Sequence, residues 1–358
     1  MSSDLVNLLL HDAQILGPWF AASFALSILA TFLVRKFAPR FGLLDVPAKP
    51  RKLHSRPTPL FGGAAIFVSF FVVVIWLLVF SNALTSGEIG TREYLGFFFG
   101  GLILMIGGFV DDKFSLSPKL AIIAPVLAAL IAIIFGIQVE KLTNPFGGVI
   151  YLAAWQSNIL VFLWLMGVMY TTKFLDGLDG LATGITSIGA VMVLALSLTA
   201  AYFQPDVALL SAVALGTLLG FLIFNFHPAS IFLGEAGSTF VGFLIGVLAV
   251  ISGGKLATAL LVIGIPALDV AFVILRRVWR GGISAAFKGD RTHLHHRLLN
   301  SGLSVRRVLF FYFALAGGFG ILTLFLQSRE KMIALGLLFL LALLVAAGLV
   351  EHTKRGTD

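Results

Sequence analysis

The stretch YLGFFFGGLILMIGGFVDDKFSLSPKL, residues 94–120, decides how this chain folds. Its apolar part, residues 94–110, carries no charge, and about 20 apolar residues cross a bilayer as a helix. Two adjacent carboxylates, Asp111 and Asp112, follow directly, although a charge at mid-bilayer costs roughly 2.5–3.5 kcal/mol. The pattern therefore predicts a transmembrane helix that brings two acidic side chains to the membrane surface, where they are candidates for function.

Apolar stretches of this kind recur along the whole chain. It has 358 residues, 59% hydrophobic and 12% charged, with mean hydropathy +1.02, whereas a soluble domain is about a quarter charged. We expect one all-α polytopic integral membrane domain over residues 1–358, without a cleaved signal peptide, and with no cysteines for disulfides or thiolate metal sites. Eleven transmembrane helices are expected, of which the fifth and eighth look short: 15–34, 60–80, 94–110, 118–136, 157–172, 180–202, 206–225, 238–252, 256–276, 307–327 and 332–350.

Basic residues predict the orientation of these helices, because cytoplasmic loops are enriched in Lys and Arg. Twenty of the 25 Lys and Arg fall on one side of the predicted bundle. The five on the other side are Arg92, Lys141, Lys255, Arg329 and Lys331. We therefore expect a multi-pass protein of the cell (inner or plasma) membrane, with its N-terminus outside and its C-terminus in the cytoplasm. This topology accounts for the net charge of +8, so no nucleic-acid partner is expected.

Polar breaks on the predicted cytoplasmic side hold five acidic residues: Asp111, Asp112, Asp176, Asp179 and Glu235. Two cytoplasmic loops, residues 35–59 and the longer 277–306, lie on the same side. The structural alternatives are a polar helix stop for the Asp111–Asp112 pair and helix-capping or first-turn roles for the other three. A pair of carboxylates at a helix C-terminus opposes the helix dipole, however, which favours a site for a cation or a charged substrate.

The motif DGLDG places Asp176 and Asp179 three residues apart, so a continuing helix would present them on one face. The glycines that follow them, Gly177 and Gly180, permit close approach of another backbone. Lys173 lies three residues before Asp176 and is a candidate partner for it. A helix cap explains one of the two carboxylates but not both together with the glycines.

A histidine motif, H-x-H-H, lies in the second cytoplasmic loop and comprises His293, His295 and His296. Such a cluster could bind zinc, but it has no helical i, i+4 pair, and the flanking Arg291 and Arg297 would repel a cation. Arginine among histidines suits an anion better, especially phosphate. A solvated basic loop is the structural alternative.

The first loop is also suited to bind an anion, because it holds Lys52, His54 and Arg56. Anionic lipid headgroups would account for this charge as well. Asp269, inside a predicted helix beside Pro266, is either a helix–helix partner or a site residue.

Carboxylates that hold Mg²⁺ and basic groups that neutralise phosphate are the requirements of phosphoryl chemistry. The membrane context indicates that one substrate is a lipid.

Five motifs, in this order, resemble the polyprenyl-phosphate N-acetylhexosamine-1-phosphate transferases: RKLHSRPTPLFGG (51–63), GGFVDDKFSLSPKL (107–120), LDGLDGLATG (175–184), FHPASIFLGEAGS (226–238) and DRTHLHHRL (290–298). The bacterial enzymes that start O-antigen and teichoic-acid linkage units look more similar than the peptidoglycan branch. The resemblance implies transfer of GlcNAc-1-phosphate, or another N-acetylhexosamine-1-phosphate, from a UDP-sugar to polyprenyl (undecaprenyl) phosphate. UMP would be released, and Mg²⁺ or Mn²⁺ would be the cofactor.

The resemblance also implies roles for individual residues. The catalytic carboxylates would be Asp111, Asp112, Asp176 and Asp179. The metal ligands would be Asp112, Asp179 and Glu235. The substrate-binding residues would be Lys52, His54, Lys119, Lys173, Asn225, Arg291, His293, His295 and His296. Membrane lipids are further expected partners, and the glycine-rich helices permit a homodimer without requiring one.

Two positions depart from the family pattern: Lys173 stands where an Asn is usual, and Glu235 where an Asp is usual. A lysine ammonium cannot ligate a cation. One hypothesis is that Lys173 pairs with Glu235 or with a substrate phosphate and alters the Mg²⁺ dependence. The other is that both changes are neutral sequence drift, with Mg²⁺ held by Asp111, Asp112 and Glu235.

Two rival functions are a non-catalytic relative that binds polyprenyl phosphate and a secondary transporter with charges along a midplane path.

Overall fold

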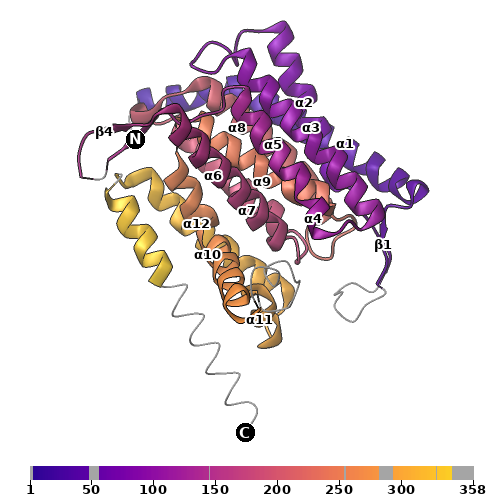
Figure 1. Ribbon diagram of the computed structural model, residues 1–358. Coiled ribbons are helices and arrows are strands. Elements are labelled where there is room, and N and C mark those ends of the chain that lie inside the picture. The colour runs from indigo at the N-terminus through magenta and orange to yellow at the C-terminus, as the bar shows by residue number, and fades with distance from the viewer. Residues whose placement is uncertain are drawn as a thin grey trace.

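Helices make up most of the structure, as expected where a membrane-spanning backbone must satisfy its own hydrogen bonds. The computed structural model describes residues 3–47, 56–144, 146–253, 255–281, 293–327 and 329–340. Figure 1 shows the long helices, which are α1 (Ser3–Phe37), α2 (Gly62–Phe80), α3 (Thr91–Phe114), α5 (Ile123–Ile134), α6 (Ala154–Leu175), α7 (Leu181–Ser197), α8 (Pro205–Asn225), α9 (Gly234–Ile251), α10 (Leu256–Gly281) and α12 (Val305–Phe325). The short helices are η1 (Ala38–Phe41), α4 (Pro118–Ala121), η2 (Ala200–Tyr202) and α11 (Leu294–Asn300), and residues 329–340 are also helical.

Each of the eleven expected spans overlaps a helix, although the last is described only as far as residue 340. Among the described residues, seven helices are long and apolar enough to cross a membrane, or eight if the two arms of α10 form one span. The arms, Leu256–Gly264 and Pro266–Ile274, bend by 75°, and proline at such a position removes a helix hydrogen bond. The multi-pass architecture is therefore confirmed, whereas the count of eleven and the orientation remain predictions.

The expectation of short fifth and eighth helices is wrong. The corresponding helices, α6 and α9, have 22 and 18 residues and meet the criteria for a span. The shorter apolar helices are instead Pro118–Ile134 and Leu181–Ser197. Both predicted spans run past their helices at the end away from the acidic motifs, where residues 135–136 and 198–199 form turns.

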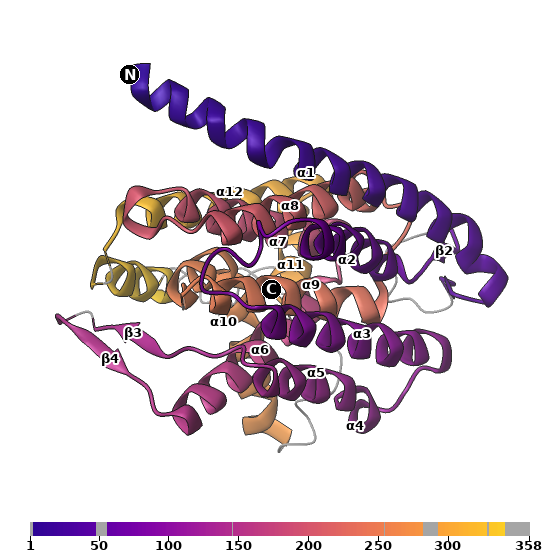
Figure 2. The ribbon, with the colours of Figure 1, turned by 90° about the horizontal axis from the view of Figure 1, so that it is seen from above.

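Helix α9 is the centre of the bundle, and all of its residues from Ala236 to Val250 are buried. It packs against α2, α3, α6 and α7, whereas α1 packs along α8 and α2 on one flank. Figure 2 shows α9 enclosed by its neighbours and the N-terminal part of α1 extending beyond the bundle. A carboxylate near the start of α9 is therefore held by the best-packed element of the fold.

Glycines bring three backbones together at the start of α9. A Cβ atom on Gly63 would clash with the Cα of Gly237, and one on Gly108 would clash with the Cα of Ala236. The Gly62 and Gly63 amides also donate to the carbonyls of Phe232 and Leu233, at 2.9 and 3.0 Å. The starts of α2 and α9 and the C-terminal part of α3 are thus fixed relative to one another by main-chain contact.

The order of the helices defines two ends of the bundle. Helices α3, α6 and α8 finish, and α2, α7 and α9 begin, at what we name the acidic end, where strands β1 (Leu44–Asp45) and β2 (Thr58–Pro59) also pair. The opposite end holds the hairpin of β3 (Lys141–Thr143) and β4 (Val149–Tyr151). Figure 1 shows β1 and β4 on opposite sides of the molecule. All five candidate carboxylates lie at the acidic end.

Candidate active site

The acidic pair ends α3, where Ser115 adopts a left-handed conformation and stops the helix. Asp111 Oδ1 accepts a hydrogen bond from the Leu116 amide at 2.8 Å. Asp112 Oδ1 accepts one from the Glu235 amide, also at 2.8 Å, and so places a negative charge at the N-terminus of α9, where the helix dipole favours it. The other oxygen, Asp112 Oδ2, is buried and has no hydrogen-bond partner among the described residues. Asp112 therefore has one oxygen committed to the fold and one available to a ligand.

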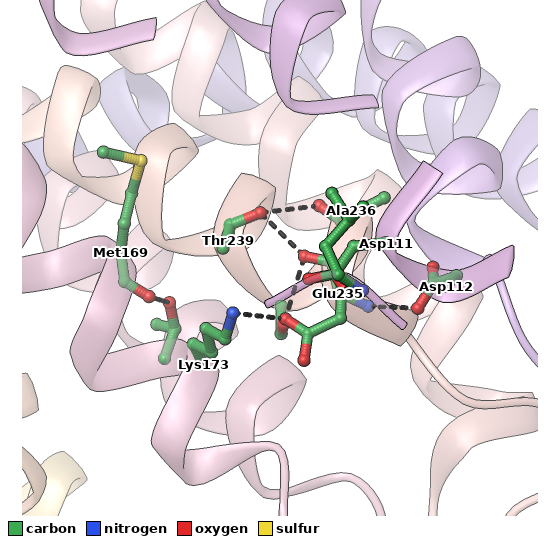
Figure 3. A network of polar contacts seen from close by, with 10 residues as sticks. Asp111, Asp112, Met169, Lys173, Glu235, Ala236 and Thr239 are labelled. Carbon is green, nitrogen blue, oxygen red and sulfur yellow. Dashed lines mark hydrogen bonds and ion pairs between the residues drawn. The ribbon is translucent and has the colours of Figure 1, made fainter. Parts of the chain in front are cut away.

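Lys173 and Glu235, the two residues that depart from the family pattern, form an ion pair with 2.6 Å between Nζ and Oε2. Figure 3 shows this contact beside Asp111 and Asp112. The hypothesis that Lys173 pairs with Glu235 is confirmed as a contact, and the structure gives no pairing of Lys173 with Asp176 within its described parts. The side chains stay 22% and 40% exposed, so a ligand can still reach both.

A small hollow, with room for about one water molecule (about 10 Å³), lies beside the ion pair, between α3, α4, α5, α6 and α9. Its polar lining consists of Asp111, Lys173, Glu235 and Thr239. The rest of the lining is Leu104, Gly107, Gly108, Ala121, Ala124 and Pro125. Thr239 donates its hydroxyl proton to the Glu235 carbonyl at 2.8 Å, which keeps the first turn of α9 in place (Figure 3). The hollow thus offers a cationic group at the edge of an apolar surface.

The DGLDG motif forms a turn, so the expectation that Asp176 and Asp179 share one face of a continuing helix is wrong. Helix α6 ends at Leu175, and Gly180 takes a left-handed φ of +77° before α7 begins. Gly180 faces the backbone of Asn225 and Phe226, as expected for a close approach. The tight turn directs the two carboxylates to different partners.

Asp179 is held by the polar segment between α8 and α9. Its Oδ2 lies 2.8 Å from His227 Nδ1 and accepts the Ala229 amide at 3.1 Å. Asp176 has no hydrogen bond or ion pair from its carboxylate to the described residues. Burial, followed by the charges of Glu235, Asp112 and Asp179, raises the pKa of Asp176 well above its usual range. An added cation would therefore relieve repulsion at Asp176 in particular.

Asn225, expected to bind substrate, has both ends of its amide engaged. Thr183 donates to Asn225 Oδ1 at 2.9 Å, and Asn225 Nδ2 donates to the Ile231 carbonyl at 3.1 Å. The side chain is 1% exposed. In this geometry it links α7 to the segment before α9, and its substrate contact remains a prediction.

The histidine motif lies beside the DGLDG turn, because a Cβ atom on Gly177 would be 3.0 Å from His295 Nε2. The rings of His293 and His295 stack at 5.9 Å, and those of His295 and His296 lie 4.3 Å apart. Burial, and then the neighbouring histidines, lower the pKa of His295 to about 3. His295 is therefore neutral at physiological pH, and its buried Nε2 has no hydrogen-bond partner in the described structure.

Asp269, which the sequence left as either a packing or a site residue, holds the histidine motif. Its Oδ2 lies 2.9 Å from His293 Nδ1, and its Oδ1 accepts the Leu294 amide at 2.9 Å. This contact favours the tautomer with the proton on Nδ1, which leaves Nε2 of His293 to interact with a substrate. His293 Nε2 is buried and lacks a hydrogen-bond partner among the described residues.

Four other expected site residues, Lys52, His54, Lys119 and Arg291, have no described contact with the site. Lys52, His54 and Arg291 lie outside the described residues. Lys119 is exposed on α4, and its phosphate contact remains a prediction. His227 was not among the expected site residues, and Asp269 was left open between packing and the site. The signals for them were a histidine in the polar break FNFHPAS and an acidic residue within an apolar helix.

A divalent cation fits the carboxylates only in part. The described residues contain no group of three His, Cys, Asp or Glu side chains placed to hold a metal ion. Mg²⁺ often needs only one or two carboxylates, with water and substrate phosphates as its other ligands. Asp112 Oδ2 and the Asp176 carboxylate fit this role, because neither has a partner in the described structure, whereas Asp179 and Glu235 are already engaged.

Comparisons with known proteins identify the family of the chain. The family model described as Glycosyl transferase family 4 matches residues 94–253. The probable undecaprenyl-phosphate N-acetylglucosaminyl 1-phosphate transferase of Bacillus subtilis is 30% identical, over 90% of this chain and 88% of that protein. The decaprenyl-phosphate N-acetylglucosaminephosphotransferase of Mycolicibacterium smegmatis is 31% identical, over 92% and 86%.

A more distant relative, the undecaprenyl-phosphate alpha-N-acetylglucosaminyl 1-phosphate transferase of Escherichia coli O157:H7, is 26% identical over 90% of this chain and 87% of its own length. The similarity thus extends from the acidic pair of α3 to the histidine motif. The chain is a multi-pass membrane protein and belongs to the polyprenyl-phosphate N-acetylglucosamine-1-phosphate transferases of glycosyl transferase family 4.

Proposed function

We propose that this protein transfers GlcNAc-1-phosphate from UDP-GlcNAc to polyprenyl (undecaprenyl) phosphate at the cytoplasmic face, releases UMP and so initiates cell-envelope glycan synthesis. The observation that carries the proposal is the meeting of three groups at one end of the bundle. These are the acidic pair of α3, the Lys173–Glu235 ion pair and the histidine motif beside the DGLDG turn. The relatives' names supply the acceptor and the sugar phosphate.

In this reaction an oxygen of the lipid phosphate attacks the phosphorus that carries the sugar. The bond from that phosphorus to the bridging oxygen breaks, and the oxygen leaves with UMP. A phosphate monoester has a second pKa of about 6, so the attacking group is largely ionised at neutral pH without a strong base. Positioning and neutralisation of charge are therefore what the site must supply.

The exposed part of Lys173, at the hollow, is the proposed contact for the lipid phosphate. The ammonium group of Lys173 would neutralise phosphate oxygens, and Ala121 and Ala124 are partly exposed apolar residues of the same lining. Asp111, whose Oδ1 is anchored by the Leu116 amide, would orient the phosphate at the helix end. This arrangement would hold the nucleophile at the boundary between the membrane and the site.

The histidine motif fits the donor's diphosphate. His293 is oriented by Asp269 and His295 by its packing against Gly177, and each has an Nε2 atom without a partner in the described structure. A phosphate oxygen only accepts hydrogen bonds, so each Nε2 would carry a proton when the donor is bound, which for His293 means an imidazolium paired with Asp269. A divalent cation, Mg²⁺ or Mn²⁺, held by Asp112 and Asp176, would supply further charge neutralisation to the phosphates when bound. We propose that Lys173, when phosphate oxygens compete with Glu235 for its ammonium group, supplies part of the cationic charge at this site, which would weaken the metal dependence.

The rival functions have less support. A secondary transporter would hold its charges near the bilayer midplane, whereas the carboxylates of α3 and α9 and the turn after α6 lie at helix ends. A non-catalytic relative would not need the whole set of motifs, whereas this chain keeps both Asp pairs and the complete histidine motif.

The test is UMP release by the purified, detergent-solubilised protein given undecaprenyl phosphate and UDP-GlcNAc, with Mg²⁺ or with EDTA. Release that depends on the lipid would establish the transferase, and release that survives EDTA would assign part of the metal's role to Lys173. UDP-GalNAc in place of UDP-GlcNAc tests the choice of sugar. No release with any UDP-hexosamine under either condition would favour the non-catalytic alternative.

A further inference from the structure

Two lysines from distant parts of the chain meet at the end of the bundle opposite the acidic end. Lys255 lies between α9 and α10, and Lys331 lies in the helix of residues 329–340. Each Nζ lies 5.8 Å from the centroid of the Tyr202 ring. This end is the one that the distribution of basic residues predicts to be outside, where lysine is scarce.

The two lysines are partly withdrawn from water. Lys331 is only 7% exposed, and burial, together with the charge of Lys331, lowers the pKa of Lys255 to about 8. Two like charges in such a place repel each other, and burial strengthens the repulsion. Neither lysine has an ion pair with a carboxylate among the described residues.

Asp206 is the acidic residue whose charge acts on Lys255, but its carboxylate is directed elsewhere. Oδ1 accepts the Val207 amide at 2.9 Å, and Oδ2 lies against Gly87. The side chain is 3% exposed. Asp206 therefore offsets part of the charge from a distance and leaves the ammonium groups open to another anion.

Both ammonium groups also have hydrogen-bond donors that are not used within the described structure. Lys255 donates to Gln204 Oε1 at 2.7 Å and to Ser197 Oγ at 3.3 Å, while Lys331 donates to Thr258 Oγ1 at 3.3 Å. An ammonium group has three donors, so one remains on Lys255 and two remain on Lys331. Three donors from two cations suit an anion with several oxygens better than a single carboxylate.

We propose that Lys255 and Lys331 form a phosphate-binding site that takes either the phosphodiester of an anionic phospholipid or free inorganic phosphate. The exposed aromatic residues Tyr202 (44%), Phe203 (58%) and Phe325 (77%) lie near this end and could contact the acyl region of a lipid. The anion would neutralise the two lysines and tie α7, the α9–α10 connection and residues 329–340 together. The site is separate from the proposed catalytic centre and does not depend on it.

The experiment measures the unfolding midpoint of the purified full-length protein in two arms. One arm adds inorganic phosphate in detergent and compares it with chloride at equal ionic strength. The other compares nanodiscs of phosphatidylcholine with and without phosphatidylglycerol. The variants are Lys255→Gln and Lys331→Gln, and the matched control is Lys141→Gln, which removes an exposed lysine from β3 at the same end.

The proposal expects stabilisation of the wild-type protein by phosphatidylglycerol, by phosphate or by both, and the arm that responds identifies the source. Loss of one charged donor should weaken binding about tenfold, while Lys141→Gln should respond as the wild type does. Without the anion, the variants should unfold no earlier than the wild type, because repulsion is relieved. Two results would overturn the proposal: stabilisation by neither anion, or a midpoint lowered by the same amount with and without the anion.

Discussion

Each end of the helix bundle holds a cluster of like charges, carboxylates at one end and two lysines at the other, and the two clusters are held differently. At the acidic end, Asp112 and Asp179 are fixed by main-chain amides of the α8–α9 region. At the opposite end, Lys255 and Lys331 reach Tyr202 on long flexible side chains and bond only to other side chains. Groups fixed by the backbone are preorganised for one geometry, whereas lysine side chains can adapt to ligands of different shape. The acidic end should therefore tolerate substitution far less.

The largest effect is expected for Asp112→Asn. The amide oxygen can still accept the Glu235 N–H, but the unpaired carboxylate charge is lost. We expect turnover to fall by about 10²–10³-fold, measured as UMP release, with little change in the unfolding midpoint. The matched control is Glu88→Gln, which removes an exposed carboxylate at the opposite end and should leave turnover unchanged. Equal inhibition by the two variants would break the comparison between the ends.

A double-mutant cycle on the ion pair should give the next largest effect. Lys173→Asn leaves Glu235 without its cation, so turnover should fall by about 10–100-fold. Adding Glu235→Asp should recover part of that loss and make turnover depend more steeply on Mg²⁺. Titration of Mg²⁺ against UMP release measures both. Effects of Lys173→Asn and Glu235→Asp that simply add, with an unchanged metal dependence, would show that the two residues are not coupled and would contradict the proposal.

Asp269→Asn should have a moderate effect on substrate binding. It removes the charge that orients His293 while keeping an acceptor for the Leu294 amide. We expect KM for UDP-GlcNAc to rise about tenfold, with a smaller change in kcat. In a protein that already carries His293→Ala, the same substitution should add nothing. A full additional loss there would show that Asp269 acts through another residue.

The smallest effect concerns stability and pH. The pKa of His295 is lowered from 6.5 to about 3 in the folded protein, so the unfolded chain binds more protons between these values. The contribution of His295 to stability is therefore present above the unfolded pKa and is lost as pH falls through this window. His295→Gln should make the unfolding midpoint less sensitive to pH there. An unchanged pH dependence would show that His295 is not buried in solution.

Apolar runs were sufficient to locate the helices, because the bilayer requires about 20 apolar residues for each span. They could not place the turn at Asp176–Gly180, since the left-handed Gly180 is selected by its contact with the α8–α9 segment. The Lys173–Glu235 contact could be anticipated because both residues depart from the family pattern together.

Two further contacts of the site could not be predicted from the sequence. His293 and Asp269 are 24 residues apart in the sequence, and His227 and Asp179 are 48 apart. Side chains so far apart meet only because the helices that carry them pack together. The local pattern marked each residue as polar in an apolar setting but contained nothing about its partner.

The glycine contacts at the start of α9 have a consequence for how this site can change over generations. Gly63 against Gly237, and Gly108 against Ala236, leave no room for a single added carbon atom. Almost any one-letter change at these glycines must push two helices apart, and no second change at the neighbour could restore the fit. Charged side chains such as Lys173 and Glu235 can be exchanged as a pair while the frame stays in place. In a library of random variants selected for activity, we expect the three glycines to be invariant and the charged pair to be variable.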